Sequence, residues 1–250
     1  MIGTIVLFIF VYLYDLQTIT FTVFTNMNAL ISGLIACTAF MLVIHEFGIQ
    51  TSPGKAWFFL LVGIFLWWVG DLVWALYDIF LPEEELFPSP GDYAYFVGYF
   101  FMWGALLYQL RIFPSRLTKK EKLLIMGIIL VIFVIFLVFL IIPILQYPIS
   151  DEFTYSQLFF SLWYPLGDLI IAGIVLTFLF KLQGGEYVKV YRLISIAFLL
   201  YVLVDFLFSW FEWQEILNSS MIYDNFYVIS SLILGGAGLV MREMLRKKDV

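Results

Sequence analysis

Apolar runs recur along the whole chain, each close to the ~20 residues that a helix needs to cross the hydrocarbon core of a bilayer. Of the 250 residues, 63% are hydrophobic and only 13% are charged, which leaves too little polar surface for a soluble domain. The short alternating segments typical of a transmembrane barrel are not visible in the sequence. We therefore predict an all-α, polytopic membrane protein.

Eight of the runs are interpreted as transmembrane helices. They lie at residues 2–17, 20–47, 57–80, 92–112, 122–146, 157–181, 189–211 and 224–242. The first is interpreted as a span and not as a signal peptide, because it lacks a basic start and a small-residue cleavage site. The connections are too short for a soluble domain, so we predict a single transmembrane domain over residues 1–250.

The basic residues predict which side of the membrane each connection occupies. All 13 lysines and arginines fall in four stretches: at Lys55, 111–122, 181–192 and 242–248. With eight spans these stretches share one side, which the positive-inside rule makes cytoplasmic. The acidic stretches lie on the opposite side, at 83–85, 151–152 and 212–215. We expect a multi-pass protein of the cell membrane with both termini in the cytoplasm.

An internal repeat relates the two parts of the chain. Residues 57–80 align with 191–214 at an offset of 134, and the alignment continues after a two-residue change in the following loop. It pairs acids and tyrosines of similar position: Asp71 with Asp205, Asp78 with Glu212, Asp92 with Asp224, and Tyr95 with Tyr227. Each half, 1–117 and 118–250, would contain four helices. Because four is an even number, we predict parallel halves related by an axis along the membrane normal.

Carboxylates inside the predicted spans are the candidate functional residues. Asp71 and Asp78 are two helical turns apart on one face of the third span, and Asp205 and Glu212 are related in the same way on the seventh. Asp168 lies near the middle of the sixth span. A charged aspartate at a helix centre costs about 2.5–3.5 kcal/mol on insertion scales, so such residues usually face a bundle interior or an aqueous cavity. No lysine or arginine lies on the predicted outer side of the membrane to pair with them.

These carboxyl groups could be protonated, because burial and like-charge neighbours disfavour the ionised form. They could instead accept hydrogen bonds from nearby hydroxyls, or hold a cation. We expect an acidic cavity, open to the outside, for a proton, a cation or a small amphiphile. Its expected ligand-binding residues are Asp71, Asp78, Asp92, Tyr95, Tyr164, Asp168, Tyr201, Asp205 and Asp224.

Structural roles for some of these residues remain open alternatives. Asp71, Asp168 and Asp205 could form interhelical hydrogen bonds that only hold the bundle together. Asp92 and Asp224 lie at predicted helix starts, where an acid complements the helix dipole.

The sequence excludes several cofactors and partners. The single histidine, His45, cannot supply a two-histidine haem site or a three-histidine metal site within one chain, and no lysine lies in the middle of a span to bind retinal. The single cysteine, Cys37, cannot form an internal disulfide. We expect no cofactor and cannot assign a metal. Nucleic acid is excluded as a partner, because the basic residues follow the pattern of topology signals.

Several motifs resemble a known sensory region. They are Gly70-Asp71, residues 88–99 (Pro-Ser-Pro-Gly-Asp-Tyr-Ala-Tyr-Phe-Val-Gly-Tyr) and residues 164–168 (Tyr-Pro-Leu-Gly-Asp). Together they resemble a multi-span region at the N-terminus of some bacterial diguanylate cyclases and histidine kinases, which looks like a sensory input. The resemblance implies a sensor-like module. Because no output domain follows the spans in this sequence, we expect it to act through a separate signalling partner.

Two aspartates are also similar to those of the eight-span lysoplasmalogenase (YhhN-like) family. The resemblance implies that Asp71 and Asp205 would form the acid/base pair of an intramembrane lipid hydrolase. That family's histidine in the following helix has no counterpart, since residues 97–99 here are Val-Gly-Tyr. A third alternative is a transporter coupled to protons or cations, for which parallel duplicated halves are a known architecture.

Overall fold

The structure is a computed structural model that describes residues 19–81, 87–112, 116–150, 153–182, 184–213 and 224–247. The expected first span at 2–17 and the acidic residues 83–85 and 151–152 lie outside the described residues. Helices are the only regular structure in the described part, which confirms the predicted all-α class. They are α2 (Ile19–Phe47), α3 (Ser52–Phe80), α4 (Pro90–Ile112), α5 (Lys119–Phe136), the π-helical turn η1 (Leu137–Ile141), α6 (Ile142–Gln146), α7 (Tyr155–Lys181), α8 (Val188–Trp213) and α9 (Asp224–Arg246).

Six helices of the described part are long and apolar enough to cross a membrane: α2, α3, the rod formed by α5, η1 and α6, then α7, α8 and α9. The six support a multi-pass membrane protein. α4 is not among them, although it is 23 residues long. Its Asp92 and Gln109 are only 2% and 1% exposed, so this helix turns polar groups into the bundle. The count of eight spans stays a prediction.

Local sequence signals explain where several helices begin. Thr51 accepts the backbone N–H of Gly54, which starts α3 at Ser52, ahead of the predicted start. Thr118 and Thr154 each form a capping box with the residue three positions later, and these caps start α5 and α7. Caps of this kind satisfy the first backbone N–H groups of a helix, which otherwise have no partner.

α5, η1 and α6 form one continuous rod with a widened turn. The widening precedes Pro143, which has no N–H to donate and whose ring crowds the carbonyl four residues earlier. The N–H of Ile142 bonds to the carbonyl of Leu137, five residues back, as in a π-helix. The wider turn therefore accommodates the proline without ending the helix.

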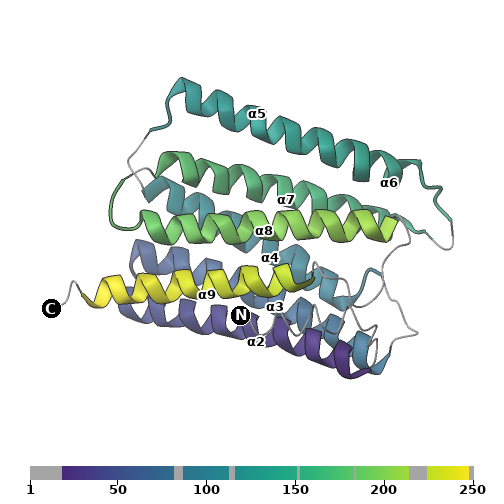
Figure 1. Ribbon diagram of the computed structural model, residues 1–250, viewed down its shortest axis with the longest axis horizontal. Helices are drawn as coiled ribbons and strands as arrows, with labels where there is room; N and C mark the ends of the chain where they lie inside the picture. Colours follow the sequence, from purple (N-terminus) through teal and green to yellow (C-terminus); the bar gives the residue numbers. More distant parts are fainter. Residues whose placement is uncertain are drawn as a thin grey trace.

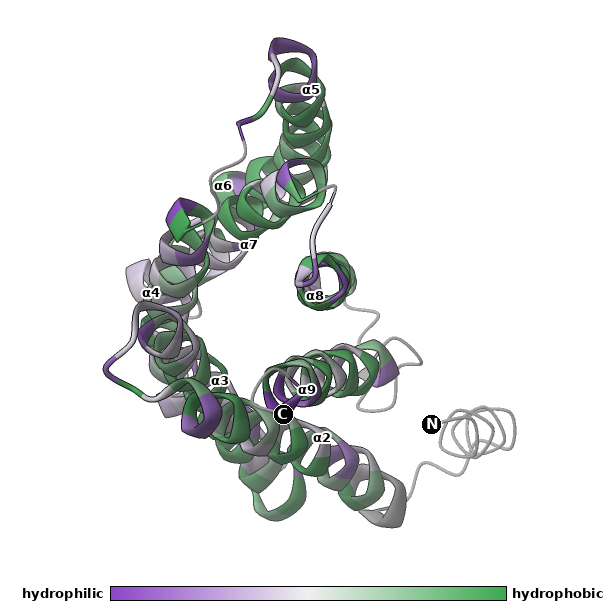
Figure 2. Ribbon diagram, turned by 90° about the vertical axis from the view of Figure 1, so that its left-hand side faces the viewer, coloured by the Kyte–Doolittle hydropathy of each residue, from purple (hydrophilic) through white to green (hydrophobic). Residues whose placement is uncertain are grey.

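The helices pack as two sets of three neighbours with α5 outside. α3 packs against both α2 and α4, and α8 packs against both α7 and α9 (Figure 1). The two sets meet where α2 contacts α9 and where α4 contacts α7, while α5 lies against α7. Viewed along the helices, α5, α7, α4, α3 and α2 follow one another in an arc, and α8 and α9 lie on its inner side (Figure 2).

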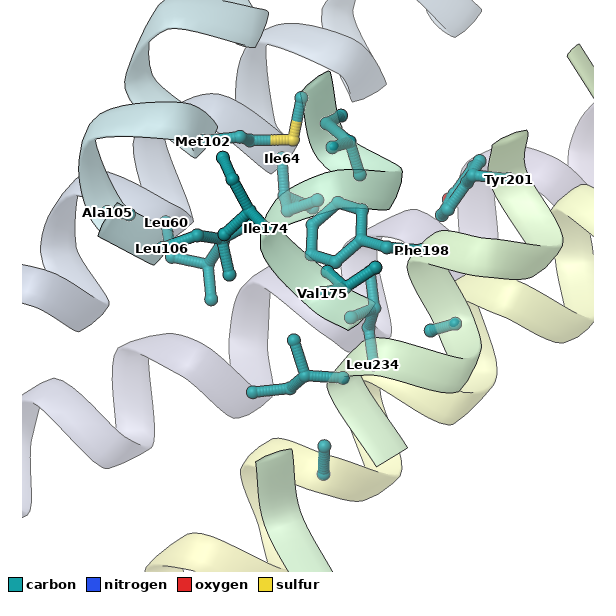
Figure 3. Close-up of a cluster of buried hydrophobic side chains, with 14 of the residues drawn as sticks. Leu60, Ile64, Met102, Ala105, Leu106, Ile174, Val175, Phe198, Tyr201 and Leu234 are labelled. Atoms are coloured by element: carbon teal, nitrogen blue, oxygen red, sulfur yellow. The ribbon is translucent and has the colours of Figure 1, made fainter. Parts of the chain in front are cut away.

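The buried core lies between the arc and the two inner helices. Leu60 and Met102 from α3 and α4 approach Val175 of α7, Phe198 of α8 and Leu234 of α9 (Figure 3). All five side chains are fully buried. The core therefore joins both sets of helices into one body.

The outer surface of the bundle is apolar, as expected for contact with lipid. On α5, Leu123, Met126, Leu130 and Val131 are 60–66% exposed. Lipid tails are as apolar as leucine, so burial of apolar surface does not drive helix association in a bilayer, and close packing and hydrogen bonds take its place. The contacts that hold this bundle together are therefore found at its glycines and its buried polar groups.

Candidate functional site

Four carboxylates of the bundle each accept a hydrogen bond from a tyrosine on another helix. The donor hydroxyls and acceptor oxygens are Tyr95 to Asp71 Oδ1 (2.7 Å), Tyr99 to Asp168 Oδ1 (2.6 Å), Tyr227 to Asp205 Oδ1 (2.6 Å), and Tyr164 to Asp92 Oδ1. The bonds join α4 to α3, α4 to α7, α9 to α8, and α7 to α4. Interhelical hydrogen bonding, the structural alternative considered for Asp71, Asp168 and Asp205, is therefore present at these three acids and also at Asp92.

The glycine before an aspartate provides the space for its tyrosine partner. A Cβ atom at Gly70 would lie 2.5 Å from the ring of Tyr95, whose hydroxyl reaches the next residue, Asp71. A Cβ atom at Gly167 would lie 2.9 Å from the ring of Tyr99, which reaches Asp168 in the same way. In each Gly-Asp pair, the glycine thus leaves space for the tyrosine ring and the aspartate accepts the hydrogen bond of its hydroxyl.

Asp92 has a second role at the start of α4. Its Oδ2 accepts the backbone N–H of Ser89 at 2.5 Å, and the hydroxyl oxygen of Ser89 accepts the N–H of Gly91 at 3.1 Å. The predicted capping role at the helix start is thus combined with the bond from Tyr164. Both oxygens of this buried carboxylate have donors from the protein.

Asp71, Asp168 and Asp205 come together from α3, α7 and α8, and we call these three side chains the acidic cluster. The carboxyl groups of Asp168 and Asp205 are near enough to interact electrostatically. Asp71 is close enough to Asp205 for direct electrostatic interaction. Asp168 is 1% exposed, whereas Asp71 and Asp205 are half-buried. Three of the predicted site residues therefore lie near one another in the bundle.

The other predicted residues lie around the cluster or apart from it. Tyr201 approaches Asp71 and Asp205, but its hydroxyl is paired with the hydroxyl of Ser231 on α9 at 2.6 Å. Asp78 is joined to Asn26 of α2, whose amide donates to its Oδ2 at 3.2 Å. Asp224 begins α9, and its side chain lies outside the described part of the structure.

Three aromatic residues of the site are absent from the set of ligand-binding residues expected from the sequence: Trp67, Tyr99 and Tyr227. Trp67 packs edge-on against Tyr99 and Tyr201, with ring centroids 5.1 and 5.2 Å apart, and Tyr201 lies 5.9 Å from Tyr227. Two signals could have found the tyrosines. Tyr99 follows Tyr95 by one helical turn and therefore shares its face of α4. Tyr227 is the counterpart of Tyr95 in the predicted repeat.

The cluster has no basic neighbour among the residues that the structure describes. Ion pairs there form at the C-terminal ends of α2 and α9: Glu46 Oε1 with Arg242 Nε (3.1 Å) and Arg246 Nε (3.8 Å), and Glu243 Oε1 with Lys247 Nζ (2.6 Å). The side-chain donors to the acidic cluster are neutral hydroxyls. Across the same described residues, no group of three or more histidine, cysteine or acidic side chains is placed to hold a metal ion.

The two contacts between the helix sets are built differently. α9 meets α2 through small residues: a Cβ atom at Gly238 would lie 2.9 Å from the Cβ of Ala39. α4 meets α7 through large rings, with the centroids of Trp103 and Trp163 5.5 Å apart. The helices of the first contact are therefore close, and those of the second are held apart by aromatic side chains.

A shallow groove of about 300 Å³ lies on the exposed face of α2 and α9, lined by residues that include Ile31, Leu34 and Leu239. None of the described residues that line this groove is a carboxylate. A cavity that opens from the acidic cluster to the outside stays a prediction. Comparison of the chain with family models, with curated proteins and with solved structures gave no match.

Proposed function

We propose that this protein is a membrane-embedded, sensor-like ligand-binding module whose acidic cluster carries a proton or a small cation. One observation carries the proposal: Asp71, Asp168 and Asp205 meet from three helices, and their side-chain donors among the described residues are neutral hydroxyls. Charge buried in hydrocarbon is costly unless it is paired. A positive ligand would supply the compensation that the protein's own side chains do not.

The position of the cluster supports a sensory role. Its hydrogen bonds connect α3 with α4, α4 with α7, and α8 with α9, so they include helices of both sets. A ligand shifts a conformational equilibrium by its difference in affinity for the two states. Binding at these carboxylates changes the attraction between helices, and a separate signalling partner at the cytoplasmic helix ends would respond to the new packing. The motif resemblance to sensory membrane regions agrees with this role.

The proposed architecture remains two parallel halves with eight spans in all. Two observations support it. The bond from Tyr95 to Asp71 joins α4 to α3, and its counterpart from Tyr227 to Asp205 joins α9 to α8. In addition, α2 packs on α9 while α4 packs on α7, which is the exchange of partners that a two-fold relation requires. We propose that the basic connections face the cytoplasm of the cell, as the positive-inside rule predicts.

A coupled transporter is the second candidate, and the same exchange of partners favours it. Parallel repeats around a central site are a known build for transporters. Protein-containing liposomes should then take up or release a solute in proportion to an imposed proton or cation gradient. An absence of any gradient-dependent flux would leave the sensory role as the better candidate.

A lipid hydrolase using Asp71 and Asp205 draws support from the electrostatic proximity of these two carboxylates. General acid and base catalysis would require both to reach one water. The hydroxyls of Tyr95 and Tyr227 each occupy Oδ1 of their carboxylate, so a hydrolase would have to use the Oδ2 atoms of Asp71 and Asp205 on that water. Hydrolysis of lysoplasmalogen or other lysolipids by purified protein, abolished in Asp71→Asn, is the test of this alternative.

Ligand binding can be tested with purified protein in lipid nanodiscs. Tryptophan fluorescence should follow binding, because Trp67 contacts the tyrosines of the cluster. The probes are pH, sodium and tetramethylammonium. Asp168→Asn and Asp205→Asn should weaken the response about tenfold or more, the factor that corresponds to 1.4 kcal/mol. Glu243→Gln is the matched control, because Glu243 is exposed and far along α9 from Tyr227.

A clear negative result is also defined. Should both asparagine variants fold and respond to protons and to each cation as the unaltered protein does, the cluster is scaffolding and the proposal fails. Circular dichroism and gel filtration establish folding in each case.

A further inference from the structure

The groove on α2 and α9 follows α2 for the depth of one bilayer leaflet. Its α2 wall runs from Ile31 to Leu42, and Leu239 lines it from α9. At ~1.5 Å per residue, α2 rises by about 16 Å between Ile31 and Leu42. That is about half of the ~30 Å hydrocarbon core, which is the extent of a single acyl chain.

The wall of the groove is apolar. Thr38 is the polar side chain among its described lining residues, and its hydroxyl donates to the backbone carbonyl of Leu34 at 2.8 Å. The hydroxyl is therefore satisfied within α2, and the methyl group of Thr38 remains for contact with an occupant. Such a surface suits a hydrocarbon chain.

Two arginines lie where the groove ends, on the same face of α9 as Leu239. Arg242 and Arg246 follow Leu239 by three and seven residues, a spacing that keeps one face of a helix. On α2, Glu46 follows Leu42 by one helical turn. Oε1 of Glu46 lies 3.1 Å from Nε of Arg242 and 3.8 Å from Nε of Arg246. The C-terminal ends of α2 and α9 lie at the same end of the bundle (Figure 1).

The arginine pair retains the capacity to bind an anion. The contact with Glu46 is made by Nε in each arginine, and a guanidinium carries four further N–H groups on its two Nη atoms. Two positive groups beside one carboxylate leave a net positive charge. The side chains of Arg242 and Arg246 are 31% and 65% exposed, so an anion at the membrane surface can reach them. Guanidinium groups match phosphate oxygens in a bidentate geometry.

We propose that the groove and the arginine pair form a binding site for one anionic phospholipid. One acyl chain lies in the groove along α2, and the phosphate is held by the Nη groups of Arg242 and Arg246. A zwitterionic lipid binds less well, because its own cation offsets the phosphate charge. On the proposed orientation the lipid belongs to the cytoplasmic leaflet, where anionic lipids attract basic residues.

This inference goes beyond the proposed function, because the acidic cluster takes no part in it. The lipid contacts both α2 and α9, so it adds a link between the two sets of helices.

Native mass spectrometry of the purified protein in detergent counts bound lipids directly. Dioleoylphosphatidylglycerol, which has a net negative charge, is compared with dioleoylphosphatidylcholine, which has the same chains and no net charge. The unaltered protein should retain one phosphatidylglycerol molecule with an affinity about tenfold or more above that for phosphatidylcholine.

A matched pair of substitutions tests the headgroup contact. Arg246→Gln should lower the affinity for phosphatidylglycerol about tenfold and leave phosphatidylcholine binding unchanged. Arg242 keeps its ion pair with Glu46 in this variant, which preserves the contact between the helices. Lys247→Gln removes the same charge one residue further along, but Lys247 pairs with Glu243 of its own helix at 2.6 Å. It should leave the preference for phosphatidylglycerol intact.

A second pair of substitutions tests the groove. Leu34→Trp fills it while both arginines remain, and it should weaken phosphatidylglycerol binding about tenfold. Leu130→Trp is the control, because Leu130 is 61% exposed on α5, away from the groove. Circular dichroism and gel filtration establish that each variant is folded.

Four results would overturn the inference. Equal effects of Arg246→Gln and Lys247→Gln would indicate general attraction of anionic lipid to the basic helix ends. Equal effects of the two tryptophan variants would show that the groove holds no chain. Binding of dihexanoylphosphatidylglycerol or of inorganic phosphate as tight as that of the dioleoyl lipid would indicate a phosphate site alone. A dimer that Leu34→Trp dissociates, with lipid binding unchanged, would assign the groove to a second copy of the chain.

Discussion

Gly167→Ala adds one methyl group at a position where the ring of Tyr99 leaves no room for it. The new Cβ would lie 2.9, 3.1 and 3.2 Å from three ring atoms of Tyr99. The ring cannot move aside freely, because Tyr99 is 1% exposed and also packs against Trp67 at 5.1 Å. The substitution must therefore either separate α7 from α4 or displace the hydroxyl from Asp168.

The magnitude follows from the two consequences. Overpacking by a methylene-sized group typically costs about 1–3 kcal/mol. Loss of the bond from Tyr99 to Asp168 adds about 1–2 kcal/mol, a value between those typical of bonds to neutral and to charged acceptors. Where both consequences occur they cost about 2–5 kcal/mol, and the higher helix propensity of alanine offsets about 1 kcal/mol of this. We therefore expect Gly167→Ala to lower the free energy of unfolding by about 1–4 kcal/mol.

The matched control lies on the same helix. A Cβ atom at Gly173 would meet only the tip of Ile129, at 3.8 Å, which is an ordinary van der Waals distance. Gly173→Ala should therefore be neutral or stabilise the protein by up to about 1 kcal/mol through helix propensity. Reversible unfolding in mixed micelles, followed by circular dichroism, measures both variants under the same conditions.

The combination with Tyr99→Phe tests the mechanism. If the clash already displaces the hydroxyl, Tyr99→Phe should cost less in the Gly167→Ala background than in the unaltered protein, since both changes remove the same bond. Equal stability of Gly167→Ala and Gly173→Ala would refute the reasoning, because the structure gives only the first a steric conflict.

Three further outcomes are expected. Tyr227→Phe should cost about 1–3 kcal/mol in reversible unfolding, because it leaves Asp205 without its donor, whereas Tyr93→Phe, at an exposed position, should cost almost nothing. Gly238→Ile should separate α9 from α2 and reduce crosslinking between cysteines placed on these two helices, since even a Cβ atom there lies 2.9 Å from Ala39. Glu46→Gln should cost less than about 1 kcal/mol, with a difference that shrinks in high salt, because its arginine partners are partly exposed.

Much of the helical organisation could be predicted from the sequence, because membrane spans depend on the local run of apolar residues. Helix starts were less predictable. The cap at Thr51 begins α3 within a polar stretch that hydropathy alone assigns to a loop. Hydropathy also fails for α4, which is part of the bundle although it is less apolar than the six candidate spans. Its buried Gln109 and Asp92 lower its hydropathy.

The site was predictable only in part. Helical spacing places Asp92, Tyr95 and Tyr99 on one face of α4, and these residues bond to α3 and α7. The proximity of Asp168 and Asp205 had no such signal. It depends on how α7 and α8 are rotated about their axes, which tertiary packing decides and which no local pattern records.

The two contacts of the helix sets differ in the side chains that they accommodate. On the proposed alignment of the halves, Asp71 and Asp205 are equivalent, whereas Asp168 falls on Leu34. Leu34 is 45% exposed on α2, and Asp168 is 1% exposed on α7. α2 approaches α9 closely through Gly238 and Ala39, and the side chain of Leu34 lies on the exposed face of α2, outside this close contact.

α7, in contrast, is held away from α4 by rings, and the space so created contains the side chain of Asp168 and the hydroxyl of Tyr99. Asp205 therefore has a carboxyl neighbour on its own side, while its counterpart Asp71 faces no equivalent acid from α2. On the proposed alignment of the halves, the wide contact between α4 and α7 thus contains an acid for which the narrow contact between α2 and α9 has no counterpart.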